Sequence, residues 1–297
     1  MSMTARGLLE GACDLHIHAG PSMFARVVDA LEAAEQARDA GMRAIVLKNH
    51  HEGSMGKAAM ARRVVEGVEV FGSIVLNYAV GGFNPFAVDA AIKLGAKIVF
   101  MPTVDARNHI RFYGVGQYGT KMQLTGVLPK AYARVQGITL LNGDGDLDPA
   151  VAEILGLIAD ADVALATCHL AIPEVKQLVR EAVAAGVHKI IVTHANFEVP
   201  NLPVEDQVEL AAMGAYIEHV VMSMFPPWHC INVDQLVERI RRVGPARCIL
   251  SSDCGKLAGP PPVEGLRMFY QLLLDSGISA AEIEVMGQIN PAKLLNL

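Results

Sequence analysis

The sequence predicts an α/β fold, a barrel of eight parallel strands that is regular or distorted and in which a helix follows each strand. Short apolar runs alternate with amphipathic stretches along nearly the whole chain, which is typical of βα units around a parallel sheet. Eight such repeats can be counted, and the 297 residues exceed the ~250 that one such barrel needs. No linker interrupts them, so we expect a single domain over residues 1–297.

The expected strands are short and apolar, and they lie at 11–18, 42–49, 68–77, 96–101, 163–168, 189–193, 215–222 and 247–252. The expected helices lie at 28–40, 54–66, 84–94, 148–160, 173–185, 204–213, 233–243, 263–276 and 280–289. Gly41 follows the first helix as a C-cap, and Asn84-Pro85 begins the third with Pro at its first position. Between 105 and 136 glycines and aromatics follow no period, so we expect a long loop inserted over the site after strand four. A short extra strand is expected at 137–141.

Composition and charge limit the classes of partner. Apolar residues make up 52% of the chain, enough for a large core, and the surplus leaves a homo-oligomer as an open alternative. The net charge of −6 and the lack of a basic run argue against nucleic acid, and no apolar run reaches the ~18 residues of a membrane span. Residues 1–10 show no signal-peptide pattern, and five cysteines without a Cys-x-x-Cys pair fit a reduced, cytoplasmic protein. A small-molecule substrate is the partner that we expect.

The segment Asp14-Leu15-His16-Ile17-His18 ends the first expected strand, and Gly20-Pro21 follows it. Side chains two apart in a strand point to the same face, so the imidazoles of His16 and His18 can converge on one metal ion. Two histidines that only form hydrogen bonds beneath the loops are the alternative. Asp14 shares this face, where it would hold an imidazole in the correct tautomer or bond to the backbone.

Histidines gather at the strand ends, where the active site of such a barrel lies. Eight of the ten follow or end an expected strand: His16, His18, His50, His51, His109, His169, His194 and His219. Asp253 follows strand eight, as a ligand and general base or as a helix N-cap. Burying several imidazoles beside a carboxylate is costly unless they are paired or bind a divalent cation. We therefore expect a metal site at this end of the barrel, although a strand-end His bonded to a backbone carbonyl is the alternative for His169 and His194.

The set His16, His18, His169, His194 and Asp253 resembles the metal ligands of the amidohydrolase superfamily. The ending Asn290-Pro291-Ala292-Lys293-Leu294-Leu295 is similar to the terminal helix of that superfamily. The resemblance covers essentially the whole chain and implies a TIM barrel that hydrolyses an amide, lactone or ester, with Asp253 as the base. It implies one or two divalent ions, most simply Zn²⁺ because imidazoles dominate. The same ligand set also serves decarboxylases, and Met101-Pro102-Thr103 on strand four offers no bridging Lys or Glu for a second ion.

A second resemblance concerns the first two strands. Asp14–His18 together with 44–50 is similar to the first motifs of the PHP phosphoesterase family, which uses up to three metals. That family has Thr-Asp-His where this chain has Lys48-Asn49-His50. The Asn removes an anionic ligand and the Lys adds a cation, and both changes argue against a multi-metal cluster. A non-catalytic barrel that binds a metal or another ligand is a third alternative.

The remaining candidates surround this set. Lys48 could bridge two metals if carboxylated, polarise a substrate or pair with a carboxylate, and His50 on the same face is a further candidate ligand. For an anionic group of a substrate we expect His51 and three residues of the long loop, namely Arg107, His109 and Arg111, with a solvated loop face as the alternative. Glu218 and His219 point to opposite faces of strand seven, so at most one faces the interior.

Overall fold

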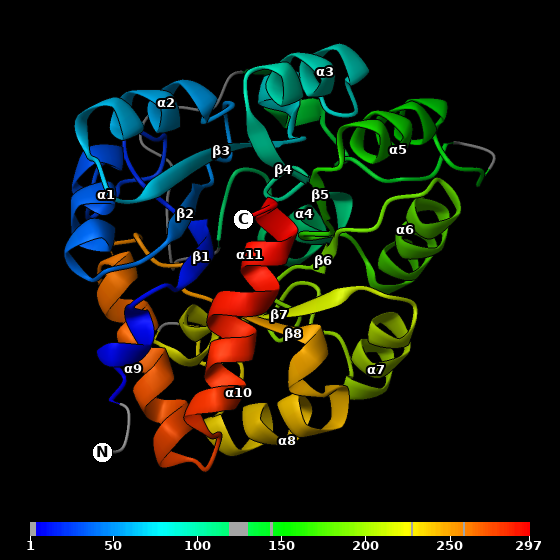
Figure 1. The fold of residues 1–297 in the computed structure, drawn as a ribbon. Coiled ribbons are helices and arrows are strands. Elements are labelled where there is room, and N and C mark those ends of the chain that lie inside the picture. Colours follow the sequence, from blue (N-terminus) through cyan, green and yellow to red (C-terminus); the bar gives the residue numbers. More distant parts are fainter. Residues whose placement is uncertain (1–3, 119–129, 143–144, 227, 258) are drawn as a thin grey trace.

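The computed structural model describes residues 4–118, 130–142, 145–226, 228–257 and 259–297. A sheet of eight parallel strands in the order β1 to β8 forms its centre, and helices surround the sheet (Figure 1). The strands are β1 (Cys13–Ile17), β2 (Ala44–Leu47), β3 (Glu69–Val75), β4 (Ala96–Phe100), β5 (Ala164–Ala166), β6 (Ile190–Val192), β7 (Tyr216–Val220) and β8 (Cys248–Ser251). The predicted (β/α)8 TIM barrel is confirmed.

The helices follow the strands in the predicted order. They are α1 (Ala30–Asp39), α2 (Met55–Val64), α3 (Pro85–Lys93), α4 (Arg107–Tyr113), α5 (Pro149–Ala161), α6 (Ile172–Ala184), α7 (Val204–Ala212), α8 (Val233–Val243), α9 (Pro262–Asp275), α10 (Ala280–Glu284) and α11 (Asn290–Leu295). Polar caps start several of them: the Asn84 side chain accepts hydrogen bonds from the backbone of Phe86 and Ala87 at the start of α3. None of the described helices combines the length and apolar character that crossing a membrane requires.

The segment expected as a long loop is partly helical. Helix α4 lies inside it, and 137–141 forms single bridges, Ala106 with Ile138 and Leu141 with Leu147, rather than a strand. The backbone N–H of Arg107 donates to the Ile138 carbonyl at 2.7 Å, so the two ends of the segment are tied together. No side-chain cap marks the start of α4, so the local sequence gives little sign of this short helix. Residues 119–129 of the predicted loop lie outside the described residues.

Hydrogen bonds just beyond the strands bring the ends of β8 and β1 together. The Asp253 N–H donates to the His16 carbonyl at 2.9 Å, and the His18 N–H donates to the Cys254 carbonyl at 2.9 Å. The buried carboxylate of Asp14 accepts from the N–H groups of His16 and Ser252, both at 3.1 Å. We call this contact the β1–β8 seam. It fixes the register of the two strand ends that carry His16, His18 and Asp253.

The last helices contact the opposite end of the barrel. The Asn290 side chain donates to the backbone carbonyls of Pro245 at 3.0 Å and Cys248 at 2.8 Å, at the start of β8. Leu294 and Leu295 are buried in the same apolar cluster as Cys13, the first residue of β1. In Figure 1 this C-terminal segment, drawn in red, runs across the barrel. The amino ends of these two strands are therefore covered, which leaves their carboxyl ends for a site.

Asp105 connects the end of β4 to neighbouring loops, and its buried carboxyl group should make the stability of the fold depend on pH. Its carboxylate accepts from the Tyr78 N–H at 2.8 Å, and burial raises its pKa to about 6. Because the folded pKa lies above the unfolded value, the stabilisation present at low pH is lost as pH rises from about 4 to 6. We expect Asp105→Asn to flatten this part of the stability curve by about 1–3 kcal/mol. Urea unfolding at several pH values measures it, and an unchanged slope would contradict the assignment.

Candidate metal centre at the carboxyl end of the barrel

A small cavity lies at the carboxyl ends of the strands. Its volume is about 10 Å³, which is room for roughly one water molecule or one ion. Its walls come from the strand ends and the loops that follow them, and they consist of His16, His18, Lys48, His50, Tyr118, His169, His194, Phe197, Asp253 and Lys256. Six of these residues, all but Lys48, Tyr118, Phe197 and Lys256, are of the types that bind divalent ions.

Three donor atoms from the β1–β8 seam converge on one point. The Nε2 atoms of His16 and His18 lie 3.3 and 3.0 Å from the same carboxylate oxygen, Oδ1 of Asp253. All three side chains are buried, and their ligand atoms lie within 4.8 Å of one another. Donors of one tetrahedral Zn²⁺ ion are about 3.4 Å apart, since Zn–N and Zn–O distances are ~2.0–2.1 Å. The donor set therefore fits a divalent metal ion.

The other nitrogen of each ring is already engaged. Nδ1 of His16 lies 3.1 Å from Oε2 of Glu218, and Nδ1 of His18 lies 3.1 Å from the carbonyl oxygen of Lys48. Both partners accept hydrogen bonds, so the protons of neutral rings lie on Nδ1 and the lone pairs lie on Nε2. A metal-binding histidine is typically held in this way. The sequence predicts Asp14 as one candidate for orienting an imidazole. In the structure Asp14 accepts hydrogen bonds from the backbone, and Glu218 is the carboxylate that contacts the His16 ring.

A second pair of histidines comes from the ends of β5 and β6. Nε2 of His169 lies 3.1 Å from Nε2 of His194, and Nδ1 of His169 lies 2.7 Å from Nδ1 of His109. Glu218 also accepts from the backbone N–H of His194 at 2.9 Å, so one carboxylate contacts His16 in β1 and His194 after β6. The ring of His50 stacks on that of His18, with 4.9 Å between ring centres, and its Nδ1 lies 2.8 Å from the Thr103 hydroxyl. Its buried Nε2 has no hydrogen-bond partner among the described residues.

The backbone is strained at three of these strand ends. Cys168, His194 and Asp253 follow β5, β6 and β8 with φ values of +52°, +31° and +50°. Residues with side chains adopt this left-handed region rarely, at a cost of ~1–3 kcal/mol each, and such strain clusters at functional sites. The kink at Cys168 comes directly before His169, and the other two lie at candidate ligands themselves. The arrangement of the side chains is thus maintained against local backbone preference.

Burial keeps the imidazoles neutral. It lowers the pKa of His18, His50 and His169 well below 6.5, and that of His194 to about 3. Neutral imidazole has the free lone pair that a metal ligand needs. Burial opposes ionisation of Asp253, but Lys256 and the neighbouring imidazoles outweigh it and hold the pKa of this carboxyl well below its usual range. The centre thus combines neutral nitrogen donors with an ionised oxygen donor.

Two lysines complete the charged groups of the cavity. Lys256 Nζ lies 2.9 Å from Oδ2 of Asp253, which leaves Oδ1 of that carboxylate to face the imidazoles. Lys48 Nζ lies 3.0 Å from Nε2 of His16 and 4.6 Å from the centre of the Phe100 ring. No ion pair joins Lys48 to a carboxylate of the described chain, so the expected pairing is not seen there. A metal ion on His16 requires that this amino group move, lose its proton or become carboxylated.

Other predicted residues lie outside the cavity. His109 is buried one layer out, where it contacts His169, and its Nε2 lies 2.8 Å from the Gln117 carbonyl oxygen. Arg107 is half-buried in α4, and Arg111 is exposed. Neither is among the described residues that line the cavity. His51 packs beside Phe24, with 5.6 Å between ring centres, and also stays outside the lining.

Sequence reasoning missed several groups of the centre. It left open which of Glu218 and His219 faces the interior, and Glu218 does, whereas His219 contacts Asn196 behind the strand at 2.9 Å. Lys256 and Tyr118 also line the cavity, and nothing in their local sequence indicates this. The strict alternation of strand side chains was the only available signal for Glu218.

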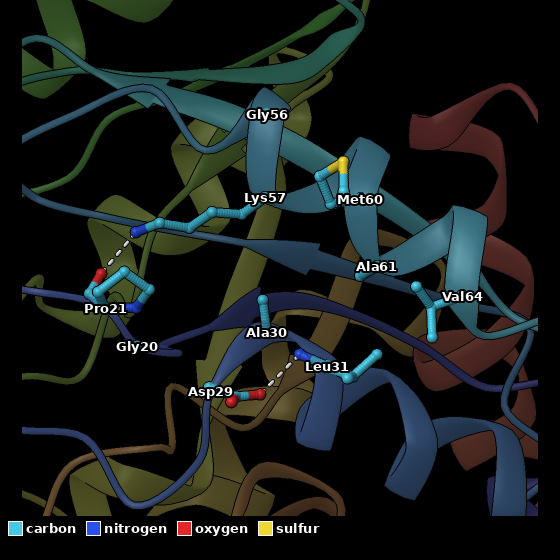
Figure 2. Close-up of a pocket in the computed structure, with 10 residues that line it drawn as sticks. All are labelled: Gly20, Pro21, Asp29, Ala30, Leu31, Gly56, Lys57, Met60, Ala61 and Val64. Carbon is cyan, nitrogen blue, oxygen red and sulfur yellow. Dashed lines mark hydrogen bonds between the residues drawn. The ribbon is translucent and has the colours of Figure 1, made fainter.

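A larger hollow lies on the outside of the barrel. It has a volume of about 520 Å³ and lies between α1 and α2, with Ala30, Leu31, Met60 and Val64 in its walls (Figure 2). Its one amino group, on Lys57, points away to the Pro21 carbonyl oxygen. This hollow is mostly apolar and holds none of the candidate metal ligands, so the chemistry belongs to the smaller cavity.

Comparisons with known proteins agree with this fold. Residues 11–218 match the model of a family of unknown function, DUF6282. Among solved structures, an amidohydrolase from Pseudomonas aeruginosa superposes with a TM-score of 0.64 at 13% identity, covering 99% of this chain and 98% of the other. The probable dipeptidase PvdM from the same species gives 0.62 at 13% identity, with 98% and 96% covered. The organophosphorus hydrolase from Deinococcus radiodurans gives 0.61 at 14% identity, with 99% and 97% covered. At such identities the likeness establishes the fold, and no curated protein sequence matches the chain.

Gly255 lies in the β1–β8 seam, where we expect any side chain to destabilise the fold. A Cβ atom at this position would lie 1.7 Å from the His18 carbonyl oxygen, and its φ is +106°. Gly95 is a matched control, since its φ is +93° but a Cβ there meets nothing within 4 Å. We expect Gly255→Ala to lower the free energy of unfolding by about 1–3 kcal/mol more than Gly95→Ala, because only the first displaces the chain beside His18. Denaturant unfolding of both variants measures the difference, and equal losses would argue against a tight seam.

Proposed function

The chain belongs to the DUF6282 family of unknown function, and we propose that it is a metal-dependent hydrolase of the amidohydrolase type. It would activate water for attack on an amide, lactone or ester of a small, anionic substrate. The observation that carries the proposal is the convergence of Nε2 of His16 and His18 on Oδ1 of Asp253, within a ring of further buried imidazoles. The amidohydrolase-like barrel supports it.

His16, His18 and Asp253 would hold the ion, with His169, His194 and His50 as further donors beside them. Zn²⁺ is the ion that this set favours, because nitrogen donors dominate and the geometry is compact. When bound, such an ion lowers the pKa of a coordinated water to about 7 and polarises a carbonyl oxygen. A second ion is not required, since β4 supplies no bridging carboxylate: Thr103 after it binds His50 and Asn77 instead.

The chain's own residues would do the remaining work. Asp253 would take a proton at Oδ1 and later pass it to the leaving group, while Lys256 holds Oδ2. Glu218 keeps a proton on Nδ1 of His16 and fixes its ring. Tyr118 and Phe197 wall the cavity, which keeps bulk water out and strengthens the charges inside it. Lys48 would polarise the substrate or, if carboxylated, bridge two ions.

The cavity volume supports a second candidate, a barrel that binds a metal or a small ligand without catalysis. About 10 Å³ does not accommodate a substrate unless wall side chains move. Assays with an ester and a lactone separate the two functions. We expect a reducing compartment such as the cytoplasm in either case, since all five cysteines are free.

Substitution of one metal-binding side chain tests the metal site. We expect His16→Ala to lose its bound divalent metal after dialysis, because one of three converging donors is gone. His188→Ala is the control, since His188 is exposed and lies before β6. Inductively coupled plasma mass spectrometry measures the metal content of both variants. Full retention of metal by His16→Ala would refute the ligand assignment.

Asp253→Asn tests the proposed base. We expect it to lower kcat/KM for 4-nitrophenyl acetate or a δ-lactone by about 10²–10⁴-fold, because a positioned general base contributes that factor. The pH–rate profile of the same variant should lose its acid limb. Hydrolysis by Asp253→Asn at the wild-type rate would remove Asp253 from the mechanism.

Glu218→Gln tests the outer partner of His16. The amide keeps the shape but loses the charge that favours a proton on Nδ1, so we expect metal affinity to fall about 10–100-fold. Competition with a fluorescent chelator gives the dissociation constant for Zn²⁺. Circular dichroism serves as the control for folding, and an unchanged constant in a folded variant would contradict the role.

A further inference from the structure

Arg26 carries a buried cationic group that the proposed chemistry does not use. It lies in the loop between β1 and α1, and its three guanidinium nitrogens are buried without a hydrogen-bond partner among the described residues. Residues 119–129, outside the described ranges, contain no Asp or Glu. Burying an unpaired charge is costly, so such a group needs a physical reason.

The guanidinium lies beside the metal centre. Arg26 forms an antiparallel bridge with Lys256, and the next N–H, of Val27, donates to the Gly255 carbonyl at 3.1 Å. Its charge acts on His18 and Asp253, two of the three residues that converge in the seam. The guanidinium carbon lies 5.7 Å from the Phe24 ring centre, and that ring lies 5.5 Å from the ring of His50.

Two of the cations around this centre lack an ion pair among the described residues. Lys256 is paired with Asp253, whereas Arg26 and Lys48 have no ion pair among the described residues. Two other carboxylates contact the histidines. Glu218 is satisfied by His16 and His194, and Asp14 is satisfied by the backbone N–H groups of His16 and Ser252. A bound divalent ion would add further positive charge. The region therefore favours a ligand that brings negative charge of its own.

We propose that Arg26 is the main residue of an oxyanion subsite that binds a carboxylate or phosphate group of the substrate beside the metal centre. The planar fork of a guanidinium forms two parallel hydrogen bonds with either group. The inference deepens the proposed function and rests on it, because the subsite would present an anionic substrate to the ion held by His16, His18 and Asp253. Like Arg107 and Arg111, the arginines on α4 that the sequence favoured for this task, Arg26 is not among the described residues that line the small cavity. Unlike them, it forms a backbone bridge with Lys256, which does line it.

Anion binding to the purified, metal-loaded protein tests the subsite. Calorimetric titrations with sodium acetate and with inorganic phosphate, at constant ionic strength, compare wild type with Arg26→Met and Arg180→Met. Arg180 is an exposed control on α6. We expect Arg26→Met to bind the preferred anion about 10–100-fold more weakly and Arg180→Met to bind as wild type does. The anion that wild type binds more tightly identifies the substrate group as carboxylate or phosphate.

Three results would overturn the proposal: wild type binds neither anion, Arg26→Met binds as tightly as wild type, or Arg180→Met loses as much affinity. Folding is not expected to confuse the test, because Met replaces an unpaired buried charge and should leave the Tm equal or higher. Arg26→Lys keeps the charge without the fork, and it should bind with intermediate affinity.

Metal content separates the two proposals. Anion binding that needs Arg26 in a protein that binds no metal would refute the proposed hydrolase but support the subsite.

Discussion

The β1–β8 seam is the constraint on which the rest of the site depends. Backbone hydrogen bonds from Asp253 to His16 and from His18 to Cys254 fix the first and last strands in one register. In that register three donor atoms from opposite ends of the chain meet within 4.8 Å. Asp14 strengthens the contact by accepting N–H groups from both strands, so a carboxylate outside the cavity sets the geometry inside it.

Glu218 extends this constraint around the barrel. It lies in β7 and bonds to a ring nitrogen of His16 in β1 and to the backbone of His194 after β6, and thus connects three parts of the barrel. Because the imidazoles are buried, such hydrogen bonds fix their orientation. The strained backbone at His194 and Asp253 is the cost of this arrangement.

Much of this could be predicted from the sequence, because strand periodicity and strand ends are local signals. The order of strands and the meeting of His16, His18, His169, His194 and Asp253 at one end both follow from a barrel of eight parallel units. Arg26 and Lys256 could not be found in this way, since two loops far apart in sequence bring them together. Helix α4 could not be predicted for a related reason. Its start is marked by a tertiary hydrogen bond to Ile138 and not by a local cap.

The seam also has a consequence for protein synthesis. His16 and His18 leave the ribosome before the rest of the barrel, whereas Asp253 emerges only after β8. A nascent or truncated chain that stops before residue 253 presents two imidazoles without the carboxylate that faces them. Such a chain lacks the complete donor set, because the three donor atoms meet only once β8 has joined β1.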